Sequence, residues 1–318
     1  MKIVGTGSFL PERITANDDL AKIVDTNDEW ISSRTGIKER RISIKDTTTD
    51  MAVKAAMAAL EDAGMKAEEL DMIITATLSA DNATPSTACQ VQGAIGATRA
   101  VCFDLNAACS GFLFSLATAQ AYMKAGMAQH VLVIGVETLS KLVDWSDRST
   151  CVLFGDGAGA AVVSKDEDSK MKLVMGSDGA KGNVLTCGAQ KLHNCYYEGE
   201  QKIDPVAMNG QEVFRFAVKT VPKCVKEVLE MAGRTVEEID HYLLHQANMR
   251  IIESVAKRLK APLEKFPMNL SHCGNTSSAS IPILLDEVNK QGRLKQGDKV
   301  VLCGFGGGLT WGAIYLEW

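Results

Sequence analysis

The sequence has 318 residues, which is long enough to bury a large core and suggests two domains or one large one. Hydrophobic residues make up 46% of it and charged residues 23%, so neither a disordered nor a fibrous protein is expected. The formal net charge of −5 gives no general reason to expect nucleic acid as a partner, and an acidic partner requires a local basic patch.

The start of the chain and its cysteines favour the cytoplasm. Residues 1–7 enter a predicted strand and lack the basic start, long apolar run and cleavage site of a signal peptide. The best transmembrane candidate, residues 105–123, contains five polar side chains, so we expect a helix buried inside the protein instead. The nine cysteines lack paired CxxC spacing, which favours reduced thiols over disulfides or a zinc site. We therefore predict a cytoplasmic protein without metal and without membrane association.

Short apolar runs alternate with helical stretches along the whole chain, which is typical of an α/β protein. Strands are predicted, in chain order, at residues 72–76, 101–105, 130–136, 158–163, 241–244 and 299–302. Helices are predicted at residues 49–63, 111–124, 213–231, 251–259 and 280–290.

The two halves of the chain look alike, which suggests a duplicated α/β unit. Three segments are echoed in the same order: 69–74 by 238–243, 103–106 by 267–270, and 130–135 by 299–304. The charged stretch 165–170 is the best boundary, since no Pro- or Ser-rich linker divides the chain. We therefore expect one half at 1–168 and a second at 169–318, with equivalent loops facing each other.

Cys109 is the first candidate for chemistry. It follows a predicted strand and stands at the start of the predicted buried helix, where unpaired amides and the helix dipole stabilise a thiolate. Its neighbours Ala107, Ala108 and Gly111 are small enough to let a substrate approach. A cysteine in apolar surroundings is otherwise often a packed small residue, so both interpretations stay open at this point.

His245 and Asn275 are the next candidates. His245 follows the apolar residues 242–244, so its ring emerges at the C-terminal edge of a strand, where α/β folds bind ligands. A single histidine is otherwise usually structural. Asn275 precedes an apolar helix, and a plain N-cap is the alternative to a functional role.

Three consecutive glycines, Gly306 to Gly308, follow the last predicted strand. They either make a tight turn or let a ligand reach backbone amides closely. The glycine-containing run at 155–160 is better explained by small residues that pack a turn against a strand than by nucleotide binding. The sequence shows no Walker loop, metal-ligand cluster or paired-carboxylate site.

Taken together, these motifs resemble the β-ketoacyl-[acyl-carrier-protein] synthase III family over nearly the whole chain. The resemblance rests on Ala107-Ala108-Cys109-Ser110-Gly111, His245-Gln246-Ala247-Asn248, Gly274-Asn275-Thr276-Ser277, the run 304–312, and three N-terminal segments at 5–11, 28–31 and 34–37. It implies a thiolase-like fold with two duplicated α/β halves in α-β-α-β-α layers. It also implies a homodimer and the opening condensation of bacterial dissociated fatty acid synthesis.

The resemblance also implies roles for the candidate residues. Cys109 takes an acyl group from coenzyme A, whose thioester is a substrate and not a cofactor. The backbone amides of Cys109 and Gly307 hold the tetrahedral oxyanion. His245 and Asn275 donate to the thioester oxygen while malonyl-acyl carrier protein loses CO2.

Binding residues follow by the same matching. Trp30, Arg34 and Arg148 are expected to hold the adenine end of coenzyme A. The pantetheine tunnel is expected to be lined by Asn209, Gly210, Phe214, Ala247 and Asn248. The acidic carrier protein is expected to dock on a basic set, for which a solvated helix face is the alternative. This set is Arg215, Arg250, Lys257, Arg258 and Lys260.

Two positions depart from the family pattern. Thr84 stands where many relatives carry an aromatic residue that reaches into the partner subunit's acyl pocket, which leaves the size of the starter open. Cys273, beside Asn275, receives no role. Cys303, close to the C-terminal glycines, keeps a non-decarboxylating thiolase as the enzymatic alternative. A non-catalytic carrier-protein-binding subunit is the alternative from another class.

Overall fold

The computed structural model describes residues 1–192, 194–196, 199 and 203–318. Within these residues, no helix is both long and apolar enough to cross a membrane. Two mixed sheets form the body of the molecule.

The first sheet belongs to the N-terminal half and has the strand order β1-β7-β6-β4-β5. Its central strand β6 runs parallel to β4 and antiparallel to β7, while β4 and β5 are parallel. The strands are β1 (Lys2–Phe9), β4 (Met72–Ala76), β5 (Val101–Leu105), β6 (His130–Glu137) and β7 (Gly157–Ser164). Because β4, β5 and β6 are parallel, the loops after them leave the same edge of the sheet.

The second sheet has the order β11-β12-β13-β8. Strands β11 and β12 are parallel, and β13 is antiparallel to both of its neighbours. The strands are β8 (Lys172–Ser177), β11 (His241–Leu244), β12 (Lys299–Gly306) and β13 (Thr310–Glu317). The loops after β11 and β12 therefore also leave a common edge.

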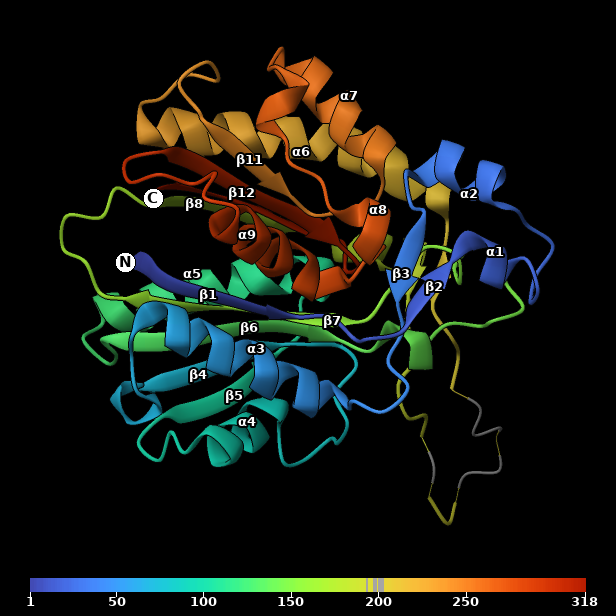
Figure 1. The fold of residues 1–318 in the computed structure, drawn as a ribbon, viewed down its shortest axis with the longest axis horizontal. Helices are drawn as coiled ribbons and strands as arrows, with labels where there is room; N and C mark the ends of the chain where they lie inside the picture. The colour runs from blue at the N-terminus through green and yellow to red at the C-terminus, as the bar shows by residue number, and fades with distance from the viewer. Residues whose placement is uncertain (193, 197–198, 200–202) are drawn as a thin grey trace.

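Helices α5 (Gly111–Lys124) and α9 (Ser280–Lys290) lie between the two sheets (Figure 1). Their apolar side chains share one core with inward-facing residues of both sheets. The outer layers are formed by α3 (Thr48–Ala63) and α4 (Thr87–Ile95) on one side, and by α6 (Gly210–Ala232) and α7 (Met249–Leu259) on the other. The result is the α-β-α-β-α layering that the resemblance implied.

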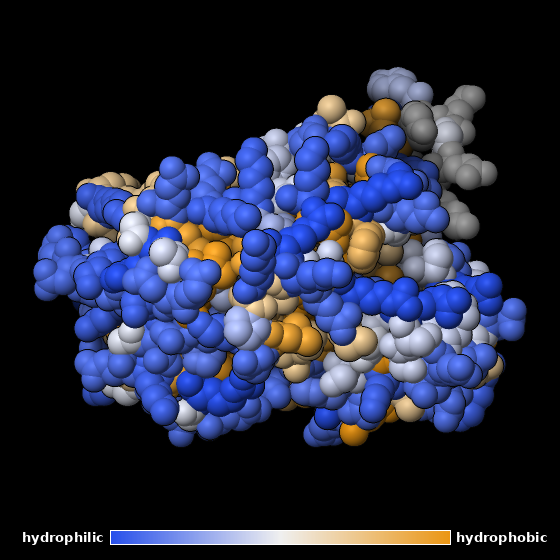
Figure 2. Space-filling view, turned by 90° about the horizontal axis from the view of Figure 1, so that it is seen from above, coloured by the Kyte–Doolittle hydropathy of each residue, from blue (hydrophilic) through white to orange (hydrophobic). Residues whose placement is uncertain are grey.

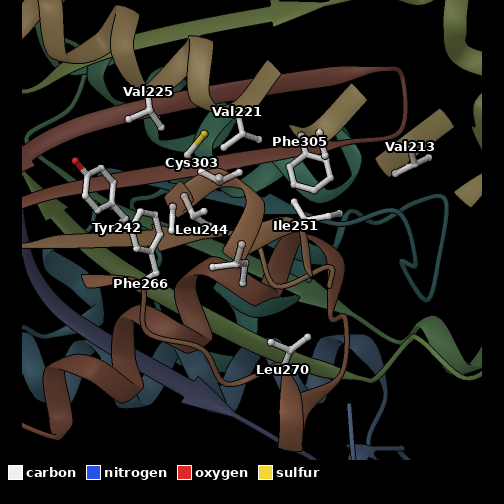
Figure 3. Close-up of a cluster of buried hydrophobic side chains, with 14 of the residues drawn as sticks. Val213, Val221, Val225, Tyr242, Leu244, Ile251, Phe266, Leu270, Cys303 and Phe305 are labelled. Carbon is white, nitrogen blue, oxygen red and sulfur yellow. The ribbon is translucent and has the colours of Figure 1, made fainter. Parts of the chain in front are cut away.

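The outer helices are amphipathic, which explains their place. Side chains from α6, β11 and β12 gather in one apolar cluster that includes Val221, Leu244 and Phe305 (Figure 3). Tyr242 and Phe266 stack in the same cluster with ring centroids 4.6 Å apart. Seen from the side of α6 and α7, the surface is mostly hydrophilic (Figure 2).

The remaining strands and α-helices are short. They are β2 (Ile14–Ala16), β3 (Glu39–Arg41), β9 (Leu185–Thr186), β10 (Ala207–Met208), α1 (Asn17–Leu20), α2 (Asp28–Thr35) and α8 (Leu270–Cys273). The strands form two separate antiparallel pairs, β2 with β3 and β9 with β10. Two 3-10 turns matter for the site: η2 (Ala108–Ser110) and η6 (Ser277–Ala279).

The predicted strands and helices are all present. The largest differences in their bounds are at β12, which continues to Gly306, and at α6, which begins at Gly210. Strand β12 continues because Gly304, Phe305 and Gly306 still pair with β13. Helix α6 begins early because the side chain of Asn209 caps it by accepting from the backbone N–H of Glu212.

The order of elements repeats between the halves, with one exception. The series α3, β4, α4 is followed by α5, β6 and β7, and the series α6, β11, α7 by α9, β12 and β13. The predicted echo of β5 at residues 267–270 is not a strand, because the chain turns directly into α8 there. The predicted boundary after residue 168 falls between β7 and β8.

Candidate active site around Cys109

A cavity of about 1790 Å³ opens where loops of the two halves meet. Cys109, His245 and Asn275 all line it, although they come from the loops after β5, after β11 and before α9. Sheet edges of this kind are where α/β folds bind ligands. The structure therefore brings together the three candidates that the sequence places far apart.

The turn that carries Cys109 is fixed by its neighbours. Ala108 has a φ of 45°, a left-handed conformation that a residue with a side chain rarely adopts. Gly306 packs directly against this turn, since a Cβ on Gly306 would lie 2.7 Å from the backbone nitrogen of Cys109. The hydroxyl of Thr310 binds the carbonyl oxygens of both Ala107 and Gly307 at 3.0 Å. The end of β12 and the start of β13 thus hold the Cys109 turn in place.

Burial and local charges act on the Cys109 thiol. Burial raises the pKa of Cys109 to about 12, a hydrogen bond from Ser277 lowers it, and the nearby charge of Glu137 raises it. The sequence predicted that the start of α5 stabilises a thiolate, and burial works against that effect. A thiolate at Cys109 therefore depends on the donors that surround it.

His245 is a neutral residue in this site. It is 2% exposed, and burial lowers its pKa to about 3. Its Nδ1 lies 2.6 Å from the Ser280 hydroxyl oxygen, and its ring packs edge-on against Phe305 at 5.3 Å. Since Ser280 occupies Nδ1, Nε2 is the nitrogen left for a ligand in the cavity.

Hydrogen bonds fix both the backbone and the side chain of Asn275. Its backbone N–H donates to Leu153 and its carbonyl accepts from Gly155, at 2.9 and 3.0 Å. Its side-chain oxygen accepts from the backbone N–H of Ser277 at 2.9 Å, which leaves the amide NH2 as a donor. The N-cap of α9 is Ala279, so the alternative role of Asn275 as the cap of that helix is wrong.

The residues expected at the adenine end lie together at one end of the site. The guanidinium carbons of Arg34 and Arg148 lie 4.8 and 5.2 Å from the Trp30 ring centroid, within cation–π range. Trp30 and Arg34 line the cavity, whereas Arg148 donates to the backbone oxygen of Asp25 at 2.7 Å.

The residues expected along the tunnel also line the cavity. They are Asn209, Gly210, Phe214, Ala247 and Asn248. Asn248 caps α7 by accepting from the backbone N–H of Arg250 and donates to the backbone oxygen of Arg34 at 3.0 Å. It therefore connects the wall of the cavity to α2.

The basic set is exposed on α6 and α7 and at the end of α7. Arg215 and Arg250 line the cavity, which puts them beside its opening. Lys257 and Arg258 lie in the last turn of α7, and Lys260 is its C-cap. Arg215 pairs with Glu212 at 2.6 Å, so one positive charge of the set is partly compensated.

Thr84, Cys273 and Cys303 do not line the cavity. Thr84 lies in the exposed loop before α4. Cys273 packs in a small apolar cluster with Ala279 and Ile283. Cys303 is 1% exposed within the apolar core, so its thiol does not face the cavity in which a thiolase base would have to act.

Sequence reasoning missed Glu137, Ser277 and Ser280 as parts of the site. Ser277 and Ser280 lie close to Asn275 in the sequence, but their partners are set by the fold. The available signal for Glu137 was a carboxylate at the end of an otherwise apolar strand. In the described part of the chain, no cluster of three or more His, Cys, Asp or Glu residues could hold a metal ion.

Comparisons with known proteins agree with this geometry. Residues 103–179 match the family described as 3-oxoacyl-[acyl-carrier-protein (ACP)] synthase III, and residues 229–318 match the C-terminal part of the same synthase. The chain is 53% identical over 320 residues to the β-ketoacyl-[acyl-carrier-protein] synthase III of Clostridium acetobutylicum, covering 100% of this chain and 98% of that protein.

Solved structures give the same result. The 3-oxoacyl-[acyl-carrier-protein] synthase III of Aquifex aeolicus is similar with a TM-score of 0.92 and 48% identity, and that of Thermus thermophilus with a TM-score of 0.92 and 43% identity. In both cases the similarity covers 100% of this chain and 99% of the other.

We predict that His245 stays neutral from pH 8 down to pH 5 and carries its proton on Nε2. Its pKa of about 3 lies below this window, so no protonation occurs in it. Ser280 Oγ has no second hydrogen-bond partner in the described residues, so its proton is available to Nδ1. Two-dimensional NMR of ¹⁵N-histidine-labelled protein measures both properties.

The variant Ser280→Ala is the matched test of the tautomer, since it removes only the donor and should raise the share of the Nδ1–H form. Ser115→Ala, which removes a buried hydroxyl without a partner in the described structure, serves as the control. A titration of His245 near its ordinary pKa of about 6.5, or an Nδ1–H tautomer in the unmodified protein, contradicts this account.

Proposed function

This chain belongs to the β-ketoacyl-[acyl-carrier-protein] synthase III family, and we propose that the cavity around Cys109 is where its reaction takes place. The chain condenses an acyl-CoA starter with malonyl-acyl carrier protein, with loss of CO2. This reaction initiates type II fatty acid synthesis. The observation that supports the site most strongly is the meeting of Cys109, His245 and Asn275 in one cavity.

Cys109 is the proposed nucleophile. Its sulfur attacks the thioester carbonyl of acyl-CoA, a new carbon–sulfur bond forms and the bond to the coenzyme A sulfur breaks. The proton of the Cys109 thiol ends on that sulfur, so free coenzyme A leaves as the thiol. The carbonyl oxygen becomes an oxyanion in this step. The backbone N–H groups of Cys109 and Gly307 are its proposed donors, supported by the Thr310 hydroxyl that ties the two backbone stretches together.

His245 and Asn275 are the proposed donors of the second step. Malonyl-acyl carrier protein loses CO2, and the electron pair of the broken bond becomes an enolate whose oxygen needs hydrogen bonds. A neutral His245 and the NH2 group of Asn275 are suited to this task, because each donates a hydrogen bond while it stays uncharged. The enolate carbon then attacks the acyl group, and the Cys109 thiolate is released.

The chain also presents surfaces suited to both carriers. A purine base that stacks on the Trp30 ring would displace the guanidinium group of Arg34 or Arg148 from it. The guanidinium groups would then bind the phosphates of coenzyme A. The basic set on α6 and α7 is the proposed docking surface for the acidic carrier protein, because Arg215 and Arg250 flank the cavity opening.

A homodimer is the proposed assembly. Strand β5 is an edge of its sheet, so its free side offers unpaired N–H and C=O groups to a second chain, and Val101 in it is 59% exposed. The loop that carries Thr84 is tied to this strand, since the backbone N–H groups of Thr87 and Ala88 donate to Asp104 at 2.7 and 2.8 Å. A partner that pairs with β5 would therefore meet Thr84.

The cytoplasm is the proposed location. All nine cysteines are free in the structure, which suits a reducing compartment.

We predict that acetyl-CoA acylates Cys109, and that His245→Ala and Asn275→Ala still acylate but lose decarboxylation by about 10²–10³-fold, the usual effect of removing an oxyanion donor. Intact-protein mass spectrometry measures the acetyl group, with Cys109→Ala as the control that accepts none. Release of CO2 from malonyl-acyl carrier protein measures the second step.

Failure of the folded unmodified chain to become acylated by several acyl-CoAs would leave only the carrier-protein-binding alternative. Condensation of acetyl-CoA alone, without release of CO2 from the malonyl substrate, would favour the thiolase alternative. Failure of either donor variant to acylate would refute the proposed division of labour.

We also predict that starters longer or more branched than acetyl compete well, and that Thr84→Phe restricts the enzyme to short starters. Each additional buried methylene contributes about 0.8 kcal/mol, roughly a fourfold preference, if the pocket has room. The measurement is kcat/KM for acetyl-, isobutyryl-, butyryl- and hexanoyl-CoA. Thr84→Ala, which keeps the space open, is the control and should keep the wild-type profile. A strict preference for acetyl-CoA that Thr84→Phe leaves unchanged would rule this out.

A further inference from the structure

Glu137 is a buried carboxylate that the steps described so far do not use. It is the last residue of β6 and is 0% exposed. A carboxylate removed from water destabilises a fold unless its oxygens accept hydrogen bonds. The hydrogen-bond partners of Glu137 therefore indicate what this buried carboxylate does in the fold.

One oxygen of Glu137 is bound by the N-terminal half. Oε2 accepts from the Ser79 hydroxyl at 2.5 Å, from the backbone N–H of Leu78 at 3.2 Å and from the Thr77 hydroxyl at 3.3 Å. These three residues form the loop directly after β4. This side of the carboxylate is thus anchored to the sheet that carries Cys109.

The other oxygen reaches the C-terminal half. Oε1 accepts from the Ser278 hydroxyl at 2.9 Å. Ser278 fits against β6 because Gly135, two residues before Glu137, has no side chain: a Cβ there would lie 2.3 Å from the Ser278 carbonyl oxygen. The carboxylate therefore joins the two halves directly beneath the cavity.

Ser278 belongs to the turn that orients Asn275. Ser277, its neighbour, has a φ of 49° and donates its backbone N–H to the Asn275 side-chain oxygen. A displacement of Ser278 is transmitted through this tight turn to the Asn275 amide. Ser277 lines the cavity with Cys109 and lowers the pKa of its thiol, so the same turn faces the nucleophile.

We propose that Glu137 is a positioning residue for the condensation: its carboxylate holds η6 against the N-terminal half, so that the Asn275 amide points at the enolate oxygen. The proposal rests on the function proposed above for Asn275. Glu137 itself does not line the cavity and contacts no reacting atom.

The protonation state of Glu137 should therefore affect the second step. Burial raises its pKa to about 7, against the hydrogen bonds of Ser79, Ser278 and Leu78. Leu78, Ser79 and Thr77 donate to an ionised Oε2, while the Ser278 hydroxyl shares its one proton between Oε1 and the carbonyl oxygen of Ala76 at 2.9 Å. Protonation at lower pH turns one carboxyl oxygen from an acceptor into a donor and so weakens this set of bonds. The rate of decarboxylation should then fall as the pH falls through about 7.

The groups that bind Glu137 do not titrate themselves. The loop after β4 and η6 present only hydroxyls and amides to it. Burial raises the pKa of the two thiols that sense its charge, Cys109 and Cys187. Lys141 donates to Thr48 and pairs with Asp81 instead of Glu137. His245 is neutral throughout this pH range. The fall of the decarboxylation rate near pH 7, called the pH limb below, therefore reports on Glu137.

The test is Glu137→Gln, which keeps the size and removes the charge. We expect decarboxylation kcat to fall about tenfold, the effect of one net hydrogen bond of about 1.4 kcal/mol, with KM for malonyl-acyl carrier protein unchanged. Acylation of Cys109 should not slow, because burial, the main cause of its raised pKa, is unchanged and the smaller contribution from the Glu137 charge is gone. The limb near pH 7 should disappear from the kcat profile.

Asp286→Asn is the matched control. Asp286 is also a buried carboxylate that joins the halves, since it accepts from the hydroxyls of Thr6 and Ser8, but it lies outside the cavity lining. This variant should lose stability while it keeps both rates and the pH limb. If Glu137→Gln fails to fold, Ser278→Ala keeps the carboxylate, removes the hydroxyl that binds Oε1 and the Ala76 carbonyl oxygen, and should show the same selective loss of kcat.

Three outcomes overturn the proposal: equal loss of acylation and decarboxylation, no loss of either, or a pH limb that persists in Glu137→Gln. Failure of the wild-type protein to acylate Cys109 would instead count against the proposed function, so the two failures are distinguishable.

Discussion

The close contact between Gly306 and the Cys109 turn is the constraint on which the site depends. A Cβ on Gly306 would lie 2.7 Å from the Cys109 nitrogen and 2.9 Å from its Cβ, so only glycine lets the end of β12 reach this turn. The contact brings the loops of the C-terminal half, with His245 and Asn275, into one cavity with Cys109, the proposed nucleophile. Gly135 and Ser278 make a second contact of the same kind. The duplicated architecture is thus closed by glycines at the ends of β6 and β12.

Burial determines how the closed site can work. It raises the pKa of Cys109 and lowers that of His245, so charge at either residue is costly in the free chain. Neutral donors that are already oriented suit a reaction in which negative charge appears and then disappears, because they need no reorganisation when it does. Ser280, Ser277 and Thr310 supply that orientation from outside the set of reacting groups.

The sequence predicted the layered fold and the three candidate residues because both leave local signals. Strands such as residues 72–76 are continuous apolar runs, Cys109 and His245 stand where such strands end, and Asn275 precedes an apolar helix. Local signals did not predict the features that depend on contacts between residues far apart in the sequence. Strand β12 runs through Gly304 and Gly306 only because β13 pairs with it. Arg40, fully buried and bound to Thr15, Asn17 and Val152, looks like a surface residue from its type alone. Glu137 acts through partners up to 141 positions away in the chain.

The rate at which acetyl-CoA acylates Cys109 in Gly306→Ala tests the central claim most directly, because the substitution adds one methyl group at the contact between the halves. We expect the rate to fall by at least about tenfold relative to wild type, since the displaced turn loses oxyanion donors, in protein that circular dichroism shows to be folded. Gly179→Ala, where a Cβ meets nothing within 4 Å, should acylate as wild type does. Wild-type acylation in folded Gly306→Ala would contradict the account.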